Sequence, residues 1–310
     1  MNSHSPEIIS QLEEISAGRF QENVPLAPFT TYRTGGNARF LVRPVSTGEV
    51  SALLTLASSK GLPVFFLGAG SNILVSDKGF PGLVICTGLL NKIVREGEKV
   101  KAQAGVRLAS LLKFCLEQKL SGLEFLAGIP GSVGGAVVMN AGLKDQWLSS
   151  RITSVTLIDK CGQFILPKEK IAFSYRSSGL ENSFVFSAEF MLVPEEYKKI
   201  HDRISSYMKE RRRKIPLPFR TAGSVFKNPE GFFAGQLIES CGLKGVHIGG
   251  AQISPVHGNI IINTGQASSS DIWELIQLAR KEVAKKFNIF LKLELHCVGG
   301  FNENSGLRRG

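Results

Sequence analysis

The pattern of apolar and polar residues along the chain predicts alternating helices and strands. Residues 47–60 carry Val50, Leu53, Leu54 and Ala57 at the spacing of one helix face, and residues 108–117 repeat this pattern. Residues 64–67 form a short apolar run after Gly61-Leu62-Pro63, which indicates a buried strand. Further helices are predicted at 195–214, 234–240 and 270–287, and further strands at 84–86, 100–104, 152–158, 163–166, 185–192, 258–263 and 290–298. Residues 1–22 predict a short helix or loose arm, and residues 24–40 a strand broken by a glycine turn.

A first glycine-containing stretch follows the predicted strand 64–67. Its residues are Gly68, Ala69, Gly70, Ser71 and Asn72. Glycine permits positive φ angles and a close approach of the backbone to a ligand. Successive backbone N–H groups in such a turn suit an anion, typically phosphate. A tight turn without a ligand is the alternative at this point.

A second stretch, residues 128–142, holds more glycines than one turn requires. Gly134 and Gly135 lie beside small residues, which indicates that a flat ligand or a second backbone passes close by. An elongated ligand such as a dinucleotide could contact both stretches. Neither matches the Gly-x-Gly-x-x-Gly fingerprint or the Gly-x4-Gly-Lys-Ser/Thr loop, which argues against a Rossmann domain and a P-loop ATPase.

Composition narrows the class of protein. The chain has 310 residues, 43% of them hydrophobic, which is enough for a substantial core and for two or three domains. No apolar run approaches the roughly 18 residues that span a bilayer, and the polar, acidic residues 1–22 predict no export signal. The five cysteines are scattered without metal-ligand spacing, so we expect no disulfide framework and a reducing, cytoplasmic location.

The formal net charge of +11 is compatible with nucleic acid or with small ligands that carry several phosphates and carboxylates. The densest basic run is residues 211–214, directly before Pro216-Leu217-Pro218. We interpret it as a solvated helix end that enters a linker, with attraction to phosphate as the alternative. The proline segment predicts a domain boundary.

Three polar residues stand in unusual settings. Arg176 lies among small hydroxyl residues next to Tyr175, a setting suited to a bidentate grip on a carboxylate or to simple stacking. Ser224 follows Gly223 and is a possible proton donor or a turn cap. Glu294 lies in an apolar run, where a charged residue suggests a functional role. Alternation along a strand places Lys292 on the same face, so a structural ion pair of Glu294 is the alternative.

Six short sequence motifs occur along the chain in a fixed order. On these motifs, the chain resembles the UDP-N-acetylenolpyruvoylglucosamine reductase family over residues 24–298. Members of this family are flavoenzymes that form UDP-N-acetylmuramate for peptidoglycan, and the chain is similar to their shorter variety. The motifs are Thr31-Tyr32-Arg33-Thr34-Gly35-Gly36, Gly68-Ala69-Gly70-Ser71-Asn72, Gly122-Leu123-Glu124-Phe125 through Met139-Asn140-Ala141-Gly142, Tyr175-Arg176, Gly223-Ser224-Val225-Phe226-Lys227-Asn228-Pro229, and Leu293-Glu294.

The resemblance implies an α+β fold with three domains. Two small α/β units form a flavin-binding module of the PCMH type, and a C-terminal α+β domain binds substrate. The implied boundaries are an N-terminal arm at 1–22, FAD-binding subdomains at 23–88 and 89–208, the substrate-binding domain at 209–298, and a tail at 299–310.

The resemblance also implies FAD as cofactor, NADPH as reductant and a UDP-sugar as substrate. It implies no nucleic-acid partner, no membrane insertion, no obligate protein partner and no metal ion. The implied FAD-binding residues are Arg33, Gly68, Ala69, Gly70, Ser71, Asn72, Ala104, Gly105, Gly128, Pro130, Gly131, Ser132, Gly134, Gly135 and Arg220. The implied substrate-binding residues are Asn140, Tyr175, Lys227, Asn228, Gln236 and His257.

The implied catalytic residues are Arg176, Ser224 and Glu294. In the family's reaction, the flavin supplies hydride to the enolpyruvyl group, and negative charge develops toward the substrate carboxylate. The resemblance implies that Arg176 and Glu294 hold that carboxylate. We expect Glu294 to be protonated or paired with Arg176, because two ionised carboxylates would repel. The resemblance also implies that Ser224 supplies the proton to the adjacent carbon.

Two departures from the family pattern affect the details of flavin or substrate contact. Leu143-Lys144-Asp145 replaces small and aromatic residues, and Val256 replaces a common lysine before His257. His257 is also compatible with a turn histidine that bonds only to its own loop.

Two other functions remain open at this point. One is an FAD-dependent oxidase or dehydrogenase of a sugar or hydroxy acid on the same flavin-binding fold. The other is a non-catalytic nucleotide or nucleic-acid binder, motivated by the charge, which leaves the glycine stretches and the three catalytic candidates unexplained.

Overall fold

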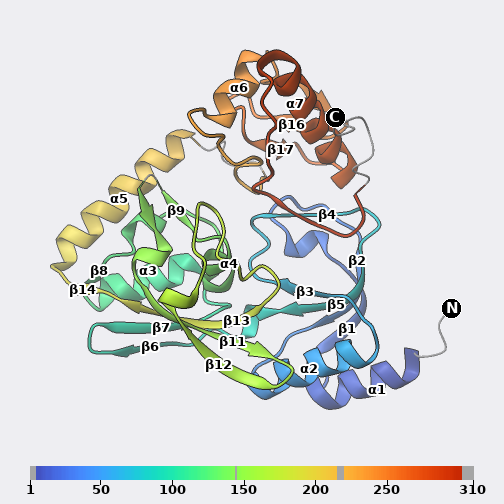
Figure 1. The fold of residues 1–310 in the computed structure, drawn as a ribbon, viewed down its shortest axis with the longest axis vertical. Coiled ribbons are helices and arrows are strands. Elements are labelled where there is room, and N and C mark those ends of the chain that lie inside the picture. Colours follow the sequence, from blue (N-terminus) through green and yellow to red (C-terminus); the bar gives the residue numbers. More distant parts are fainter. Residues whose placement is uncertain (1–4, 144, 215–219, 302–310) are drawn as a thin grey trace. The chain divides into compact units, whose positions relative to one another are not determined.

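The computed structural model describes residues 5–143, 145–214 and 220–301, and the chain divides into two compact units. The first unit comprises the residues up to Glu22, Arg39–Ala69 and Gly82–Arg211, and the second comprises Asn23–Ala38, Gly70–Pro81 and the residues from Arg212 onward (Figure 1). The boundary predicted at Pro216-Leu217-Pro218 and the tail beyond Phe301 lie outside the described residues.

Helices and strands are mixed throughout the described chain, which confirms the predicted α+β class. The helices are α1 (Ser5–Ser16), α2 (Thr47–Ser59), α3 (Leu108–Glu117), α4 (Val133–Val138), α5 (Tyr197–Lys214), α6 (Ala234–Ser240) and α7 (Ser269–Phe287). The strands are β1 (Phe20–Pro25), β2 (Asn37–Val42), β3 (Val64–Leu67), β4 (Ile73–Val75), β5 (Phe80–Cys86), β6 (Ile93–Glu96), β7 (Lys99–Gln103), β8 (Leu120–Ser121), β9 (Gly142–Leu143), β10 (Gln146–Trp147), β11 (Ile152–Asp159), β12 (Gly162–Pro167), β13 (Phe184–Met191), β14 (Val193–Pro194), β15 (His247–Ile248), β16 (Ala251–Ile253), β17 (Ile261–Asn263) and β18 (His296–Val298).

Five helices were correctly predicted, and apolar spacing was the basis for two of them, α2 and α3. Helices α3 and α6 have the predicted bounds, and α2, α5 and α7 differ by at most two residues at an end. The strand predicted at 290–298 is wrong except for its last three residues, β18. Leu291 and Leu295 are buried, but the segment before β18 makes only an isolated bridge, Phe226 with Leu293.

The two larger sheets of the first unit each pack on a hydrophobic core. A sheet of order β1-β2-β5-β3 contains the parallel pair β3 and β5, and α1 and α2 complete one core with Phe40, Leu53 and Ile85. A five-stranded sheet of order β12-β11-β13-β7-β6 is antiparallel. Helix α4 contacts β13 and β7, and the second core contains Leu111, Val137 and Phe190.

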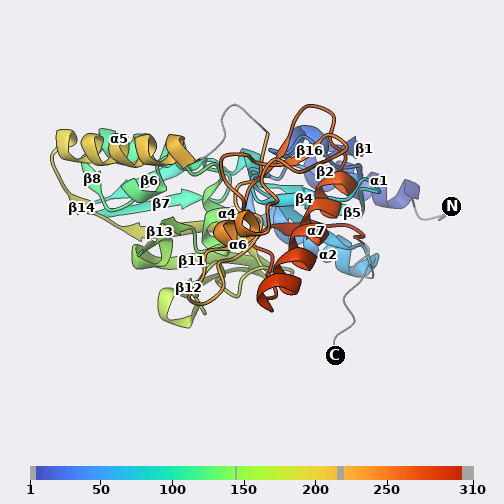
Figure 2. The same cartoon turned by 90° about the horizontal axis from the view of Figure 1, so that it is seen from above.

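The second unit has its own core around α7. Helices α6 and α7 lie side by side in both views (Figures 1 and 2), and α7 contacts the antiparallel strands β15, β16 and β17. A capping box at Ser268 and Asp271 begins α7, and the side chain of Asp77 accepts hydrogen bonds from the backbone N–H groups of Ser269 and Ser270. Strand β18 pairs in parallel with β4 and so ties the end of the described chain to residues 73–75.

A buried carboxylate fixes α5 in the first unit. Glu124 is 6% exposed, and its Oε1 lies 2.8 Å from Nη2 of Arg203 on α5. Burial alone would raise the pKa of Glu124, but hydrogen bonds from Arg203, from the backbone N–H of Gly122 and from Ser121 outweigh it and hold the pKa below its ordinary value. The pair holds α5 against the 121–126 segment.

None of the described helices is both long and apolar enough to cross a membrane. All five cysteines lie in the described part and are free thiols.

The Glu124–Arg203 contact generates a stability prediction. Glu124→Gln should lower the free energy of unfolding by about 1–2 kcal/mol, because it weakens a charge-assisted contact whose arginine is partly screened by solvent. Because folding lowers the pKa of Glu124, its contribution is complete above the ordinary pKa of 4.5 and is lost as pH falls through the folded value.

Urea unfolding at a series of pH values from neutral to acidic measures this effect. Asp202→Asn is the control, because the ion pair that it removes, Lys198–Asp202, is exposed. The control should match the wild type throughout. A Glu124→Gln deficit that stays constant with pH would contradict the assignment.

Candidate functional site

The first glycine stretch follows β3 and approaches two other backbone segments. A Cβ atom on Gly68 would lie 2.5 Å from Oγ of Ser132, so only glycine fits beside that hydroxyl. Gly70 has φ of 66°, and a Cβ there would lie 1.9 Å from the carbonyl oxygen of Phe29. The glycines of this stretch are therefore required by close contacts within the protein.

The second glycine stretch pairs with residues 104–106. The N–H of Gly134 donates to the carbonyl of Ala104 at 2.9 Å, and the N–H of Val133 donates to Val106 at 2.9 Å. A Cβ on Gly134 would lie 2.8 Å from Cβ of Ala104. A second backbone therefore passes close to Gly134, which is one of the two predicted alternatives. The stretch also contains the short helix α4, which the sequence analysis missed because glycine disfavours helices by about 1 kcal/mol.

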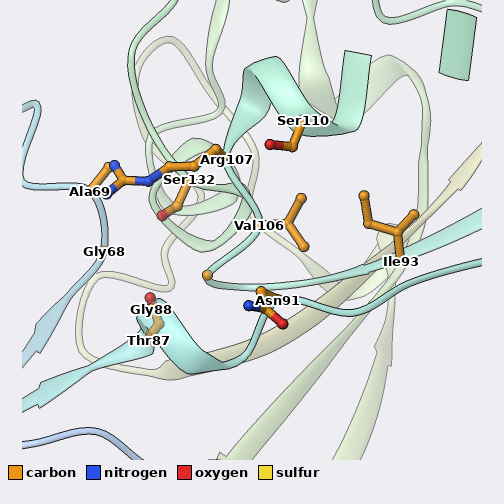
Figure 3. A pocket seen from close by; sticks show the side chains of 11 residues that line it. Gly68, Ala69, Thr87, Gly88, Asn91, Ile93, Val106, Arg107, Ser110 and Ser132 are labelled. Carbon is orange, nitrogen blue, oxygen red and sulfur yellow. The ribbon is translucent and has the colours of Figure 1, made fainter. Parts of the chain in front are cut away.

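A pocket of about 410 Å³ opens in the first unit (Figure 3). Its walls come from the end of β3, the turns after β5 and β7, the start of α3 and the second glycine stretch. Its lining residues are Gly68, Ala69, Thr87, Gly88, Asn91, Ile93, Gly105, Val106, Arg107, Ser110 and Ser132. Four of these, Gly68, Ala69, Gly105 and Ser132, were predicted to bind FAD.

The pocket has the features expected for part of a dinucleotide. The hydroxyl of Ser132 is buried without a hydrogen-bond partner, and the small residues Gly68 and Gly105 leave backbone atoms close to the pocket surface. Among the described residues, Arg107 is the only charged one that lines it. Small residues, a hydroxyl and a cation match the donors that bind phosphate groups, so these residues fit part of FAD.

Sequence analysis missed seven lining residues: Thr87, Gly88, Asn91, Ile93, Val106, Arg107 and Ser110. The one available signal was the position of Arg107 directly before the predicted helix 108–117. The other predicted FAD residues of the first unit, Ala104, Gly128, Pro130, Gly131, Gly134 and Gly135, lie in the two paired segments without lining the pocket. Arg33, Gly70, Ser71, Asn72 and Arg220 belong to the second unit.

Arg176 lies in a tight turn of the first unit beside aromatic rings. Its φ is 55°, and the turn is closed by backbone hydrogen bonds between Ser174 and Ser177. The guanidinium carbon lies 5.5 Å from the ring of Trp147 and 5.4 Å from the ring of Tyr175. Trp147 on β10 was not predicted. It supplies an aromatic residue close to the Leu143-Lys144-Asp145 departure, of which Lys144 lies outside the described residues.

Asn140, predicted to bind substrate, holds this turn in place. Its Nδ2 donates to the carbonyl of Ser174 at 3.0 Å, and its Oδ1 accepts from the backbone N–H of Ser149 at 3.1 Å. The hydroxyl of Ser178 donates to the carbonyl of Val138 at 2.9 Å. The end of α4 therefore fixes the turn that carries Arg176.

The prediction that residues 211–214 form a solvated helix end is wrong for Arg211. Its Nε is buried without a hydrogen-bond partner, and its side chain packs on Gly128, where a Cβ would lie 2.8 Å from Cδ of Arg211. Burial, and then the positive charge of Arg176, lower the pKa of Arg211 to about 10. Arg212 and Arg213 are exposed, as predicted.

In the second unit, Ser224 and Glu294 lie on adjoining segments. Ser224 is bridged to Ile260, and the carbonyl of Val225 accepts from the N–H of Glu294 at 2.9 Å. The Oδ1 of Asn259 accepts a hydrogen bond from the backbone N–H of Phe226 at 2.9 Å, and its Nδ2 donates one to the carbonyl of Phe226 at 2.8 Å. Residues 224–227 are therefore held from both sides.

Asn72 was predicted to bind FAD, and its side chain contacts the backbone next to a catalytic candidate. Its Nδ2 donates to the carbonyl of Glu294 at 3.0 Å, and its own carbonyl accepts from the N–H of His296 at 3.0 Å. Asn72 thus holds the backbone at Glu294.

Three of the predicted substrate residues of the second unit, Asn228, Gln236 and His257, lie on or next to α6. Asn228 Oδ1 accepts from the N–H of Ala234 at 3.0 Å, and Gln236 is exposed on α6. His257 Nδ1 accepts from the N–H of Asn259 at 3.1 Å, as a turn histidine does. Lys227 is half-buried, and its backbone N–H donates to the carbonyl of Lys292.

Two predicted FAD residues of this unit are exposed arginines. Arg33 has φ of 60° and donates to the carbonyl of Pro28, and Arg220 is bridged to Asn263. Within the described ranges, no group of three or more His, Cys, Asp and Glu side chains could hold a metal ion. The structure therefore brings together Arg176, Tyr175 and Asn140 in one unit, and Ser224, Glu294 and Asn72 in the other.

Two protein families match this chain. The family described as "FAD binding domain" matches residues 38–165, and "UDP-N-acetylenolpyruvoylglucosamine reductase, C-terminal domain" matches residues 215–298. The first match contains the pocket and both glycine stretches, and the second contains Ser224 and Glu294.

Similar proteins extend over almost the whole chain. UDP-N-acetylenolpyruvoylglucosamine reductase of Clostridium novyi is 42% identical over 97% of this chain and 99% of its own length. The Moorella thermoacetica protein of the same name is 45% identical, over 89% of this chain and 92% of its own length. The crystal structure of the reductase (MurB) from Thermus caldophilus superposes with a TM-score of 0.78, at 33% identity over 89% of this chain and 98% of that one. The chain therefore belongs to the UDP-N-acetylenolpyruvoylglucosamine reductase family and is an FAD-dependent oxidoreductase.

Proposed function

We propose that this protein uses NADPH to reduce the enolpyruvyl group of UDP-N-acetylenolpyruvoylglucosamine to UDP-N-acetylmuramate, a precursor of peptidoglycan. The observation that carries the proposal is the family match along nearly the full chain at 42–45% identity. We assign the reaction to the cytoplasm, because five free cysteines suit a reducing compartment.

The proposed division of labour follows the predicted domains. Residues 23–88 and 89–208 bind FAD, and residues 209–298 bind the UDP-sugar. Asn140, Tyr175, Lys227, Asn228, Gln236 and His257 remain the proposed substrate-binding residues. The contacts of Asn140, Asn228 and His257 with nearby backbone support a positioning role for these three side chains.

Arg176 is the proposed partner of the substrate carboxylate. A planar guanidinium can donate two parallel hydrogen bonds to a carboxylate. A non-glycine residue with positive φ costs roughly 1–3 kcal/mol, a strain that is common at functional sites. The φ of 55° and the hydrogen bonds of Asn140 support a guanidinium that is held in place before substrate binds.

Ser224 and Glu294 are proposed to act on the same substrate. Bound FAD supplies hydride chemistry, while the protein supplies position and electrostatics. Ser224 donates a proton to the substrate carbon next to the one that receives hydride, and Glu294, protonated or paired with Arg176, holds the carboxylate as charge develops on it. The hydrogen bond between Glu294 N–H and Val225 carbonyl supports a fixed spacing between these two segments.

Arg211 adds a second positive charge beside Arg176. No ion pair of Arg211 is found among the described residues, although burial of an unpaired charge is costly. A polyanionic ligand would offset both charges. Both the UDP-sugar, with its diphosphate and carboxylate, and NADPH have this character.

A coupled assay tests the proposed function. Purified protein, NADPH and UDP-N-acetylenolpyruvoylglucosamine should give NADPH oxidation that requires the enol ether, with a product heavier by two hydrogen atoms. Oxygen consumption with a sugar or hydroxy acid alone would favour the oxidase or dehydrogenase alternative. A protein that takes up no FAD would contradict both.

The role of Ser224 can be separated from folding and cofactor binding. Ser224→Ala should slow reoxidation of the reduced enzyme by the enol ether about 100- to 10,000-fold, the range for loss of a general acid. Reduction by NADPH should be unchanged in rapid-mixing experiments. Ser240→Ala, at an exposed serine of the same unit, is the control. If Ser224→Ala slowed reduction by NADPH as much as reoxidation by the enol ether, the result would argue against proton donation by Ser224.

Arg211 can be tested by comparing stability with ligand binding. Arg211→Met keeps the aliphatic contact with Gly128 but removes the half-buried charge, so the thermal midpoint of ligand-free protein should stay equal or rise. Binding of NADPH or of the UDP-sugar should weaken about tenfold or more, by calorimetry, since a charge-assisted hydrogen bond is worth roughly 1.5–3 kcal/mol. Arg212→Met, at an exposed position, should change neither quantity. A lower midpoint with unchanged binding would mean that Arg211 is only structural.

A further inference from the structure

The pocket of the first unit contains one cation and no acidic side chain. Arg107 is the only charged residue of its lining, and no carboxylate lies within ion-pair distance of this arginine in the described chain. Figure 3 shows its side chain extending from the start of α3 toward the Gly68 and Ala69 side of the pocket. The guanidinium is therefore available to an anion in the pocket.

The backbone around Arg107 is held rigidly. Arg107 and Ser132 form an isolated antiparallel bridge, and hydrogen bonds at Val106 and Leu108 flank it at 2.9 and 3.1 Å. These bonds fix the backbone of Arg107 next to the backbone of Ser132 in the pocket wall.

A second, independent feature points to a ligand at the same place. Ser132 is 2% exposed, and its hydroxyl has no hydrogen-bond partner although it lines the pocket. A buried hydroxyl without a partner costs about 1–3 kcal/mol. Arg107 also occupies the N-cap position of the ten-residue helix α3, whose N-terminus carries partial positive charge. Hydroxyl, guanidinium and helix end all favour a phosphate.

The pocket holds only one part of a dinucleotide. Pockets for drug-sized ligands measure roughly 300–1,000 Å³, so the pocket of about 410 Å³ is at the small end of this range. FAD is larger than a drug-sized ligand and does not fit into it as a whole. Arg176 and Tyr175 of the same unit are absent from its lining, so the reacting ring system has no catalytic candidate in this pocket. Ile93, Val106 and the amide of Asn91 offer apolar and hydrogen-bonding surface to a nucleoside.

We propose that this pocket binds the adenosine diphosphate end of FAD, that Arg107 contacts its pyrophosphate, and that Arg107 thereby makes the protein selective for FAD over riboflavin. The inference rests on the flavin-binding part of the proposed function. It assigns a specificity role to a side chain outside the glycine stretches.

Flavin binding to the apoprotein tests this assignment without any measurement of turnover. Flavin-free wild type, Arg107→Met and Arg107→Lys are titrated with FAD, FMN and riboflavin, and flavin fluorescence gives each Kd. Arg107→Met should weaken FAD binding about 10- to 100-fold, as for loss of a charge-assisted hydrogen bond, and leave riboflavin binding unchanged. Arg107→Lys should recover part of the affinity because it keeps the charge.

The matched control is Lys113→Met on the same helix, because Lys113 is exposed and pairs with the exposed Glu117. It should match the wild type for every flavin. The salt dependence of FAD binding should also weaken in Arg107→Met, because one ionic contact is lost.

Ser132→Ala gives a second readout at the residue bridged to Arg107. Removal of an unpartnered buried hydroxyl should leave the thermal midpoint of the apoprotein unchanged or higher and weaken FAD binding.

Two results would overturn the proposal. They are an equal loss of FAD and riboflavin affinity in Arg107→Met, and unchanged FAD affinity in that variant. Weaker NADPH binding alongside unchanged FAD affinity would assign Arg107 to the reductant. Failure of the wild type to bind FAD would instead contradict the proposed function.

Discussion

The close contact between two backbone segments of the first unit underlies the rest of the proposed site. Gly134 can donate to the carbonyl of Ala104 only because neither segment carries a larger side chain there. Gly105 shows the same constraint, since a Cβ would lie 1.9 Å from the carbonyl of Thr87. The segments joined by these contacts carry the lining residues Thr87, Gly105 and Ser132, and the contact at Gly134 lies in the first turn of α4. The end of α4 leads to Asn140, which holds the turn of Arg176. One packing constraint therefore links the proposed cofactor pocket to the proposed carboxylate-binding residue.

Positive charge is used in two ways in this fold. Arg203 is neutralised by Glu124 and serves to hold α5. Arg107 and Arg211 have no ion-pair partner among the described residues, and burial, followed by the positive charge of Arg176, lowers the pKa of Arg211. Charges of one sign that gather in partly buried places raise the local concentration of anionic ligands. The net charge of +11 thus suits phosphate-bearing small molecules, whose recognition needs a few placed cations more than an extended basic surface.

Local patterns predicted most of the regular structure and the general location of the site. The amphipathic helices α2, α3 and α7 were predictable because apolar spacing determines which face is buried. Gly68 and Ser132 were predictable as members of glycine-rich stretches. Arg107, Trp147 and Arg211 were not, because their proximity to the pocket or to Arg176 depends on contacts between segments distant in sequence. The strand predicted at 290–298 failed because residues 291–295 pair mainly through single contacts to Val225 and Lys227 rather than through a ladder. The roles of Ser224 and Glu294 came from family resemblance, since neither side chain has a pattern of its own.

An anaerobic spectroscopic titration tests the central claim most directly. The visible spectrum of the purified, flavin-loaded protein is recorded, one equivalent of NADPH is added, and then UDP-N-acetylenolpyruvoylglucosamine is added. The account predicts that the yellow colour is lost with NADPH and returns in full with the enol ether, without oxygen. A reduced spectrum that persists after the enol ether is added would contradict the account.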